Sequence, residues 1–274
     1  EIFDNDLIVD SYNDKKGLIA NIRSYAVFDY LNAKLCDDSE KDSYVISADV
    51  LLATQFGAPQ KRMRFVVMGI RKSITDKVKL PEGKFKKGPF RTVEDAIKDL
   101  EDVEPVFNVS DDKYGIKLCK KTGLSDLAQS LRDTNILHNH IITKTTDVAM
   151  ERFMALEQGQ NFHSLSDELK TNTYTDISRT QNTIYLRLKY NEPSGTVVNV
   201  RKSMWVHPTK NRAISIREAA RLQTFPDSFV FCGTKDKQYQ QVGNAVPPIM
   251  AEAIAEKLVI QLSKALDAKA KEDL

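Results

Sequence analysis

Hydrophobic and polar positions along the first part of the chain predict one helix followed by two strands. Apolar residues recur at nearly helical spacing between Leu18 and Leu35, which predicts an amphipathic helix over residues 18–35. Apolar and β-branched runs at Tyr44–Val50 and Met63–Ile70 predict two neighbouring strands, because a loop containing Pro59 separates them. This part of the chain therefore predicts mixed α and β structure.

The remaining pattern predicts short helices and a long final helix. Short helices are expected at Thr92–Leu100 and Asp147–Leu156, and the polar stretch 171–183 predicts a loop. Ser215 and Glu218 have the spacing of a capping box, which predicts a helix through Leu222 that Pro226 ends. After Pro247 and Pro248, an i, i+4 apolar stripe predicts a buried C-terminal helix; its members are Met250, Ile254, Leu258, Leu262 and Leu266.

Composition excludes several classes of protein. The chain has 274 residues, of which 41% are hydrophobic and 28% charged, and these proportions are typical of a globular protein rather than a disordered or collagen-like one. No apolar stretch is long enough to span a bilayer, so we expect a cytoplasmic protein with no membrane partner. Cys36, Cys119 and Cys232 are widely separated, which argues against a disulfide scaffold and against a cysteine-based zinc site.

Charge is segregated along the chain although the formal net charge is only +2. Residues 60–91 are strongly basic, residues 92–112 are acidic, and residues 179–217 are basic again. Such segregation favours a face that binds a polyanion, because each neutralised phosphate releases condensed counterions. Solvated surface charges are the alternative interpretation of the same pattern.

Gln60, Arg62 and Arg64 are candidate chemical residues because they alternate at i, i+2 and i+4. In an extended segment they project from one face, so two guanidinium groups and one amide converge. Paired arginines of this kind suit a phosphate, a carboxylate or the polar edge of a base. The alternative is an exposed edge strand that uses charge to prevent aggregation.

Two further segments carry polar groups that suit a ligand. Gly243–Pro248 is expected to open the last helix, where free amides and the Asn244 side chain favour an anionic or polar group, although a plain loop is the alternative. His138 and His140 suggest a metal or nuclease site, but no further set of ligands accompanies them. We therefore expect no metal site.

Taken together, three segments resemble the last three signature motifs of the DNA cytosine-5 methyltransferases, in the order of that family. They are Phe56–Phe65, Arg212–Pro226 (which contains Arg217–Pro226) and Gln241–Pro248. In addition, Tyr185–Leu188 and His207–Pro208 resemble the family's closing segments. The resemblance implies an α/β fold: the C-terminal part of a Rossmann-like methyltransferase sheet with an inserted mixed α+β target-recognition domain. It also implies three segments, namely 1–91 in the catalytic core, 92–232 as the recognition domain, and 233–274 returning to the core.

The N-terminal motifs of that family do not occur in this sequence. The family has a Gly-rich cofactor loop, a Pro-Cys-Gln nucleophile loop and a Glu-Asn-Val acid motif, whereas none of the three cysteines here follows a proline. The chain therefore resembles either the C-terminal half of a longer enzyme or the smaller subunit of a split one. We expect it to be inactive alone and to need an N-terminal catalytic half as partner.

The resemblance implies methyl transfer from S-adenosyl-L-methionine to C5 of a cytosine flipped out of duplex DNA, after a cysteine thiolate adds to C6. By position, Arg64 would donate to cytosine O2, Arg62 would bind the flanking phosphate or order the nucleophile loop, and Gln60 would hold the local loop. Asn244 and Val246 would line the cofactor pocket. Arg217 and Glu218 are expected to be structural.

Target recognition is expected between Lys98 and Met204, since side chains there can read base edges in the major groove. The candidates lie in the polar loop and are Thr175, Ser178, Arg179, Gln181 and Asn182. Restriction-modification is the expected context by family analogy. The alternatives are a non-catalytic, sequence-specific DNA-binding module and, less favoured, RNA as substrate.

Overall fold

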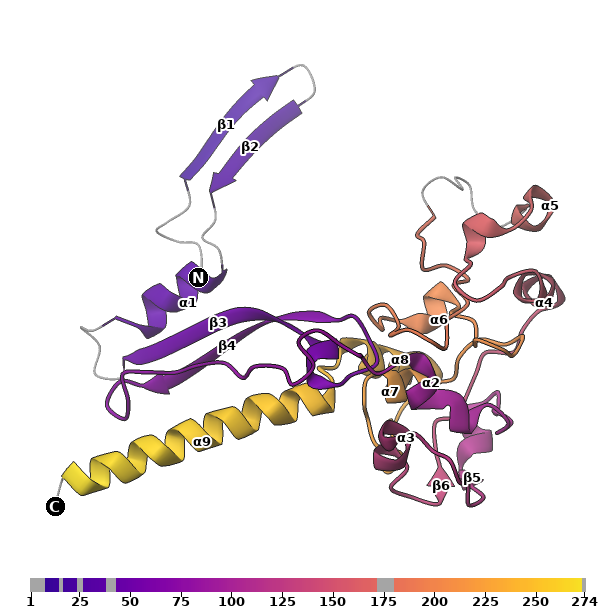
Figure 1. Cartoon of the computed structure of the whole chain (residues 1–274). Coiled ribbons are helices and arrows are strands. Elements are labelled where there is room, and N and C mark those ends of the chain that lie inside the picture. Colours follow the sequence, from indigo (N-terminus) through magenta and orange to yellow (C-terminus); the bar gives the residue numbers. More distant parts are fainter. Residues whose placement is uncertain (1–7, 15–16, 24–26, 38–42, 172–179, 273–274) are drawn as a thin grey trace. The chain divides into compact units, whose positions relative to one another are not determined.

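The computed structural model describes residues 8–14, 17–23, 27–37, 43–171 and 180–272, drawn in colour in Figure 1. The chain divides into two compact units. The first unit takes residues from Glu1–Asp49, Phe65–Pro81 and Ala255–Leu274, and the second consists of Val50–Arg64 and Glu82–Ile254. These units are defined by packing, whereas the three segments expected from the sequence follow chain order, so that segment assignment stays a prediction.

The first unit begins with a strand pair and a short helix. Strands β1 (Ile8–Asp14) and β2 (Gly17–Arg23) pair antiparallel, and α1 (Val27–Leu35) follows. The predicted helix over 18–35 is therefore wrong for residues 18–23 and right for its second half. Residues four apart share one face of a strand as well as one face of a helix, so the spacing of Leu18 and Ile22 fits both elements.

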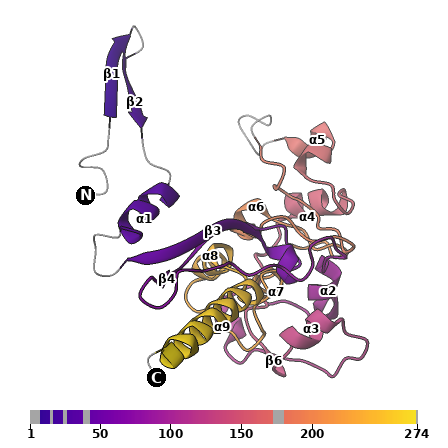
Figure 2. The ribbon, with the colours of Figure 1, turned by 60° about the vertical axis from the view of Figure 1, so that its left-hand side comes forward.

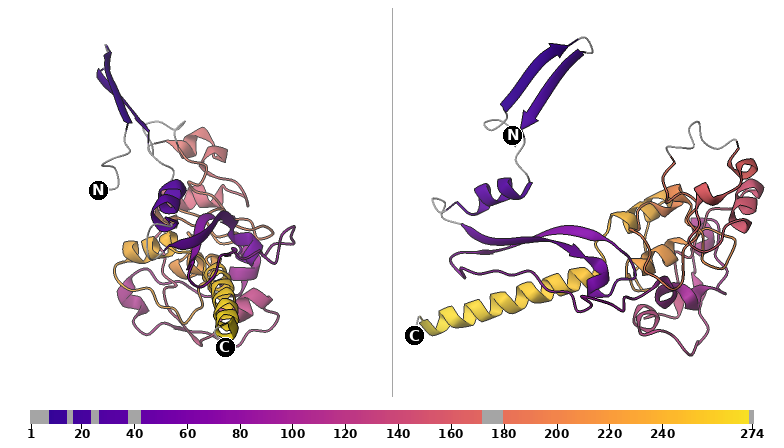
Figure 3. Two further views of the ribbon diagram at one scale, coloured as in Figure 1. Left: turned by 90° about the vertical axis from the view of Figure 1, so that its left-hand side faces the viewer. Right: turned by 45° about the horizontal axis from the view of Figure 1, so that its top comes forward.

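A two-stranded sheet and the long C-terminal helix complete the first unit. Strands β3 (Tyr44–Leu52) and β4 (Met63–Arg71) pair with each other, which confirms the two predicted strands. Helix α9 (Pro248–Glu272) runs alongside them (Figure 1 and Figure 3). Oε1 of Gln261 in this helix accepts from the Lys79 amide at 2.8 Å, and its Nε2 donates to the Lys79 carbonyl at 3.0 Å. The predicted burial of this helix is confirmed only in part, because Met250 is fully buried and Ile254, Leu258 and Leu262 are half-buried, whereas Leu266 remains 48% exposed.

Short helices dominate the second unit. The elements beyond β4 are α2 (Val93–Ile97), β5 (Ile116–Lys117), α3 (Asp126–Leu131), β6 (Ile136–Leu137), α4 (Asp147–Met154), α5 (Asp167–Lys170), α6 (Val200–Ser203), α7 (Ile216–Leu222) and α8 (Lys235–Asn244). Single 3-10 turns lie at Ala53–Phe56, Lys98–Leu100, Val109–Asp112 and Phe162–Ser164. The predicted helices near residues 92, 147 and 216 are confirmed.

The core of the second unit forms where α2, α3, α7 and α8 meet around the fully buried Trp205. Helix α7 is buried at every residue, and it begins with the predicted capping box between Ser215 and Glu218. In Figure 2, α7 and α8 lie in the same part of this unit, and the two elements contact each other. A smaller apolar cluster packs α4 against Phe162 and Tyr185.

The fold class is mixed α and β, as expected. Each sheet among the described residues has two strands, so the larger Rossmann-like sheet implied by the resemblance is not confirmed by the described part of the chain. Within those same residues, no helix combines the length and the apolar character needed to cross a membrane.

Candidate functional site

The segment that precedes β4 is fixed against a distant part of the second unit. Gln60 forms a parallel bridge with Ser194. The Lys61 amide donates to the Ser194 carbonyl at 2.8 Å, and the Ser194 amide donates to the Pro59 carbonyl at 2.9 Å. This pairing directs alternate side chains of the segment into the protein interior.

Gln60 is fully buried and joins three stretches of chain. Its side-chain amide donates to the Leu222 carbonyl at 2.9 Å and to Oε1 of Gln223 at 2.8 Å. Its Oε1 accepts from the amide of Val197 at 3.1 Å. Both polar atoms of this side chain are thus hydrogen-bonded to other parts of the protein. Such bonding agrees with a residue that fixes the position of a loop.

Arg62 is also fully buried. Its Nη1 donates to the Val197 carbonyl at 2.7 Å and its Nη2 to the Gly243 carbonyl at 3.0 Å, while Nε is buried without a partner among the described residues. A Cβ on Gly243 would lie 2.7 Å from the Val198 carbonyl oxygen, so glycine permits this close approach. The Arg62 guanidinium therefore faces the protein and does not present itself to an external phosphate.

The predicted alternation along this segment is confirmed. Lys61, Met63 and Phe65 are exposed, whereas Gln60 and Arg62 are buried. An edge strand that uses Arg62 to prevent aggregation is therefore excluded. Arg64 differs from the other two inward residues because it is only partly buried, and its Nη1 donates to the Met63 carbonyl at 2.8 Å.

Asn244 and Val246, the expected cofactor residues, lie at the junction between α8 and α9. Gly243 and Asn244 end α8, and α9 begins at Pro248, so the expectation that the whole segment opens the last helix is wrong for its first two residues. Both side chains are exposed, and Val246 is 42% exposed. Their role in holding a cofactor stays a prediction.

The expected recognition residues are only partly covered by the structure. Thr175, Ser178 and Arg179 lie outside the described residues. Gln181 and Asn182 are exposed, and the carbonyl of Asn182 accepts from Nδ2 of Asn161 at 3.0 Å. Their role in DNA recognition stays a prediction.

Arg217 of α7 is bonded inside the protein, which agrees with the structural role expected for it. It is fully buried and donates to the carbonyls of His138, Pro226 and Phe229 at 2.7 to 2.9 Å. Burial lowers the pKa of Arg217 to about 10, although the nearby Asp227 opposes this shift.

Glu218 carries a negative charge, and its pKa is set by a different balance between burial and neighbouring charges. Burial alone would raise the pKa of Glu218, but the bidentate Arg212 guanidinium, at 2.7 and 2.8 Å, outweighs it and lowers that pKa. A buried carboxylate with these partners remains charged and anchors the start of α7.

His138 and His140, the residues behind the metal hypothesis, are bonded inside the protein. The His140 ring bonds to Oγ of Ser215 and to the Val103 carbonyl, both at 2.9 Å, and the His138 ring lies 3.2 Å from the Asp112 carbonyl. Within the described ranges, no cluster of three or more His, Cys, Asp or Glu side chains could hold a metal ion.

Arg187 is an organising residue whose role was not predicted from the sequence. Its Nη1 donates to the His207 carbonyl at 2.8 Å, and its Nη2 donates to the Phe153 carbonyl at 2.6 Å and to Oδ1 of Asn211 at 2.7 Å. It thereby joins the segments around residues 185–188 and 207–208. The available signal was the resemblance of Tyr185–Leu188, which contains this arginine, to one of the closing segments of the family.

Several arginines of the basic runs are buried and therefore cannot contribute to a charged surface. Arg62, Arg187 and Arg217 are at most 4% exposed, and their donors are directed at backbone carbonyls. The prediction that these runs form a polyanion-binding face is therefore wrong for these residues.

Comparisons with known proteins agree on one family. The model of the C-5 cytosine-specific DNA methylase family matches residues 26–260. Type II methyltransferase M.DdeI of Desulfomicrobium norvegicum is 27% identical over 244 residues, which cover 84% of this chain and 58% of that protein. Type II methyltransferase M.AquIB of Picosynechococcus is 35% identical over 144 residues, which cover 48% of this chain and 95% of that protein.

A solved structure shows the same fold. A protein described as a DNA modification methyltransferase encoded within an E. coli prophage superposes with a TM-score of 0.63 at 27% identity, covering 86% of this chain and 64% of that one. The chain spans a little over half the length of the first curated relatives that it matches, 58% and 51%.

Proposed function

Because the chain belongs to the C-5 cytosine-specific DNA methylase family, we propose that it is the C-terminal half of a DNA cytosine-5 methyltransferase. The completed enzyme transfers a methyl group to C5 of a cytosine flipped out of duplex DNA. One observation carries the proposal: Gln60 and Arg62 hold together residues of all three matching motif segments, namely Leu222, Gln223 and Gly243 as well as their own. The motifs are therefore joined by a shared framework.

The missing half supplies the cofactor loop and the nucleophilic cysteine, either from the same longer polypeptide or from a separate subunit. Two observations support this. The chain spans only about half the length of relatives such as M.DdeI. The match to M.AquIB, which is named a methyltransferase, covers 95% of that protein but only 48% of this chain. A protein shorter than this chain therefore carries the name of a type II methyltransferase.

S-adenosyl-L-methionine is the proposed methyl donor, and it supplies an electrophilic methyl group when bound. Asn244 and Val246 would hold one edge of it, the first through its side-chain amide and the second through apolar contact. Both are exposed at the end of α8, and the Arg62 bond to the Gly243 carbonyl fixes the backbone beside them.

Arg64 is the proposed group that touches the reacting base. It would donate to cytosine O2, where negative charge develops as the nucleophile adds to C6 of the ring. Its partial exposure supports this role, since Gln60 and Arg62 are fully buried. Those two residues act through position: they hold the segment from which Arg64 projects.

We assign residues 1–91 and 233–274 to the catalytic core and residues 92–232 to target recognition. The exposed Gln181 and Asn182, with Thr175, Ser178 and Arg179 beside them in the sequence, are the proposed base-reading candidates. A restriction-modification setting follows from the type II names of the relatives.

The experiment measures transfer of radiolabelled methyl from S-adenosyl-L-methionine to duplex DNA, with the chain alone and with its N-terminal half added. We expect transfer only after addition. Arg64→Ala should then lower transfer by roughly 100-fold to 1,000-fold while duplex DNA binding persists. Arg71→Ala, which alters an exposed arginine later on β4, is the matched control and should transfer normally.

Other outcomes distinguish the alternatives. DNA binding without transfer in either mixture would favour a non-catalytic DNA-binding module. Equal loss of binding and transfer in Arg64→Ala would show that Arg64 contacts a phosphate rather than the base. Transfer to RNA but not to DNA would overturn the proposed substrate.

A further inference from the structure

The junction between α8 and α9 is held at both of its ends by two consecutive residues from a distant part of the sequence. Gln223 and Thr224 follow directly after α7. Nε2 of Gln223 donates to the Val242 carbonyl at 2.7 Å, and Oγ1 of Thr224 accepts from the Ile249 amide at 3.2 Å. The two bonds therefore hold the chain immediately before and immediately after residues 243–248, which form the junction loop.

Gln223 connects the junction loop to the segment that carries Arg64. Its side chain is fully buried. Besides the bond to Val242, its Oε1 accepts from Nε2 of Gln60 at 2.8 Å. Loss of this side chain would leave buried polar groups without a partner, which is costly because water does not replace the missing bonds there. Gln223 therefore fixes the first end of the loop relative to residues 60–64.

Thr224 holds the second end of the loop from an unusual backbone conformation. Its φ is +66°, in the left-handed region that a β-branched residue rarely adopts, and it is buried. Such a conformation costs free energy and persists only where the surrounding structure fixes it. Ile249 is the second residue of α9, so its amide has no acceptor within the helix and takes the Thr224 hydroxyl instead. Glycine would adopt this φ without cost, but it has no hydroxyl.

The junction loop combines a fixed backbone with exposed side chains. Its Gly243 carbonyl accepts from Nη2 of Arg62 at 3.0 Å, and Pro247 is buried. Asn244 and Val246 are nevertheless exposed. A loop that is already ordered binds a ligand more tightly, because the entropy of ordering it is not lost on binding. The anchors at both ends therefore preorganise the two side chains proposed to hold the methyl donor.

We propose that Gln223 and Thr224 are positioning residues for S-adenosyl-L-methionine, which act by holding the junction loop in the conformation that presents Asn244 and Val246. That these two side chains contact the methyl donor rests on the proposed function. Gln223 and Thr224 lie within the segment assigned to target recognition, at residues 92–232. The inference therefore separates them from that role: their loss should weaken binding of the donor and leave binding of DNA unchanged.

The first measurement is amide hydrogen exchange of residues 243–251 in the chain alone. Thr224→Val removes the hydroxyl and keeps the branched shape, whereas Thr224→Ser keeps the hydroxyl. Exchange should be roughly threefold to tenfold faster in T224V, as expected for the loss of one hydrogen bond, and T224S should match the unaltered chain. Thr224→Gly also lacks the hydroxyl and should show the faster exchange. It keeps the test decisive if T224V does not fold, because glycine tolerates the positive φ.

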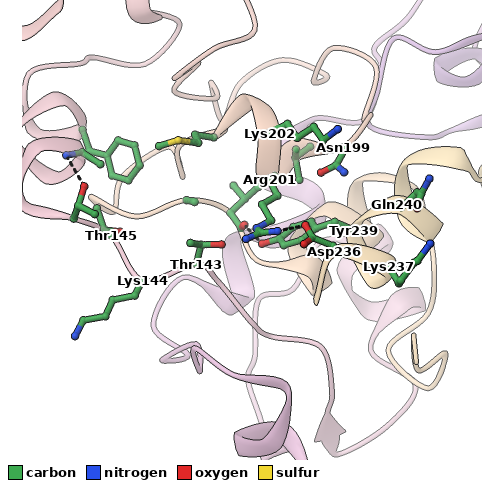
Figure 4. A pocket seen from close by; sticks show the side chains of 17 residues that line it. Thr143, Lys144, Thr145, Asn199, Arg201, Lys202, Asp236, Lys237, Tyr239 and Gln240 are labelled. Carbon is green, nitrogen blue, oxygen red and sulfur yellow. Dashed lines mark hydrogen bonds and ion pairs between the residues drawn. The ribbon is translucent and has the colours of Figure 1, made fainter. Parts of the chain in front are cut away.

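The matched control is Thr146→Val. Oγ1 of Thr146 accepts from a backbone amide at the start of α4 at 3.3 Å, so the substitution removes the same kind of bond in the same unit. Thr146 lines a separate pocket of about 760 Å³, whose lining also includes Lys144, Lys202 and Lys237 (Figure 4) and no residue of the junction loop. Exchange in the junction loop should be unchanged in this control.

The second measurement is binding of S-adenosyl-L-homocysteine by the chain combined with its N-terminal half, using isothermal titration calorimetry, together with KM and kcat for methyl transfer. In T224V and in Gln223→Met, the Kd for this ligand and the KM for the methyl donor should rise by roughly threefold to tenfold. The Kd for duplex DNA should stay the same, and T224S should restore the unaltered values. A merely structural role would lower the amount of active enzyme, and hence kcat, without changing either KM or Kd.

Three results would overturn the inference. One is exchange in T224V and T224G that equals that of the unaltered chain. Another is an equal loss of affinity for S-adenosyl-L-homocysteine and for DNA, because these residues would then serve the whole protein. The third is an unchanged Kd for S-adenosyl-L-homocysteine in all variants, which would leave the proposed methyl transfer standing. If the unaltered combination itself binds no S-adenosyl-L-homocysteine, the donor role fails together with the proposed function.

Discussion

The second unit contains positively charged side chains in two kinds of surroundings: buried arginines such as Arg221, and exposed lysines such as Lys202 and Lys237. Arg221 is fully buried, and it donates to both carboxylate oxygens of Asp227 at 2.5 and 2.9 Å and to the Ala96 carbonyl at 3.1 Å. Lys202 and Lys237 are exposed, and their ammonium groups have no partner among the described residues. The position of a basic residue in the fold, and not its presence in a basic run, therefore decides whether it stabilises the protein or is available to a ligand.

The largest expected effect tests the buried side of this comparison. Arg221→Ala should lower the free energy of unfolding by roughly 3–5 kcal/mol, because it leaves the buried carboxylates of Asp99 and Asp227 without their shared partner. Urea denaturation followed by circular dichroism measures this change. Lys237→Ala is the exposed control and should stay within about 0.5 kcal/mol of the unaltered chain. Similar changes in both variants would contradict the comparison.

The next prediction concerns how the free energy of unfolding depends on pH. His207 is fully buried beside Glu218. Burial lowers the pKa of His207 from 6.5 to about 4, although Glu218 opposes this shift. Between these values the unfolded chain binds a proton that the folded chain does not. Stability should therefore fall as the pH falls through this window, by about 2 kcal/mol between about pH 7 and pH 5.

Burial also lowers the pKa of His140, which adds loss of stability in the same direction. The measurement is the urea midpoint at several pH values for the unaltered chain and for His207→Gln. The variant should show a shallower decline between about pH 7 and pH 5. An unchanged decline would show that His207 does not cause it.

The smallest expected effect concerns the cap that begins α7. Oγ of Ser215 accepts from the Glu218 amide at 3.0 Å, and the Ser215 amide donates to Oε2 of Glu218 at 2.7 Å. Ser215→Ala should cost about 1 to 2 kcal/mol of unfolding free energy, because it removes one half of the capping box and also the hydrogen bond between Oγ and the buried His140 ring. Thermal unfolding measures it, and Ser110→Ala in an exposed turn is the control. No change in the first variant would show that the Glu218 carboxylate suffices for the cap.

Local pattern was sufficient for several elements. The strands at 44–52 and 63–71, the capped helix at 216–222 and the long final helix follow from β-branched runs, a capping box and i, i+4 spacing. Each depends on side chains that are close in sequence. The helix expected at residues 18–23 failed because a short apolar spacing suits a strand equally well, and pairing with residues 8–14 selects the strand.

For the candidate site, the sequence by itself determined which residues alternate: Gln60, Arg62 and Arg64 share one side of their segment. Only the tertiary structure decided that the Gln60 side chain bonds to Leu222, 162 positions away, and that the Arg62 side chain bonds to Val197, 135 positions away. Arg64, in contrast, remains partly exposed. It also brought Lys144, Lys202 and Lys237 around one pocket. The physical reason is that desolvation and hydrogen bonding depend on which distant groups surround a charge, and short-range periodicity carries no information about them.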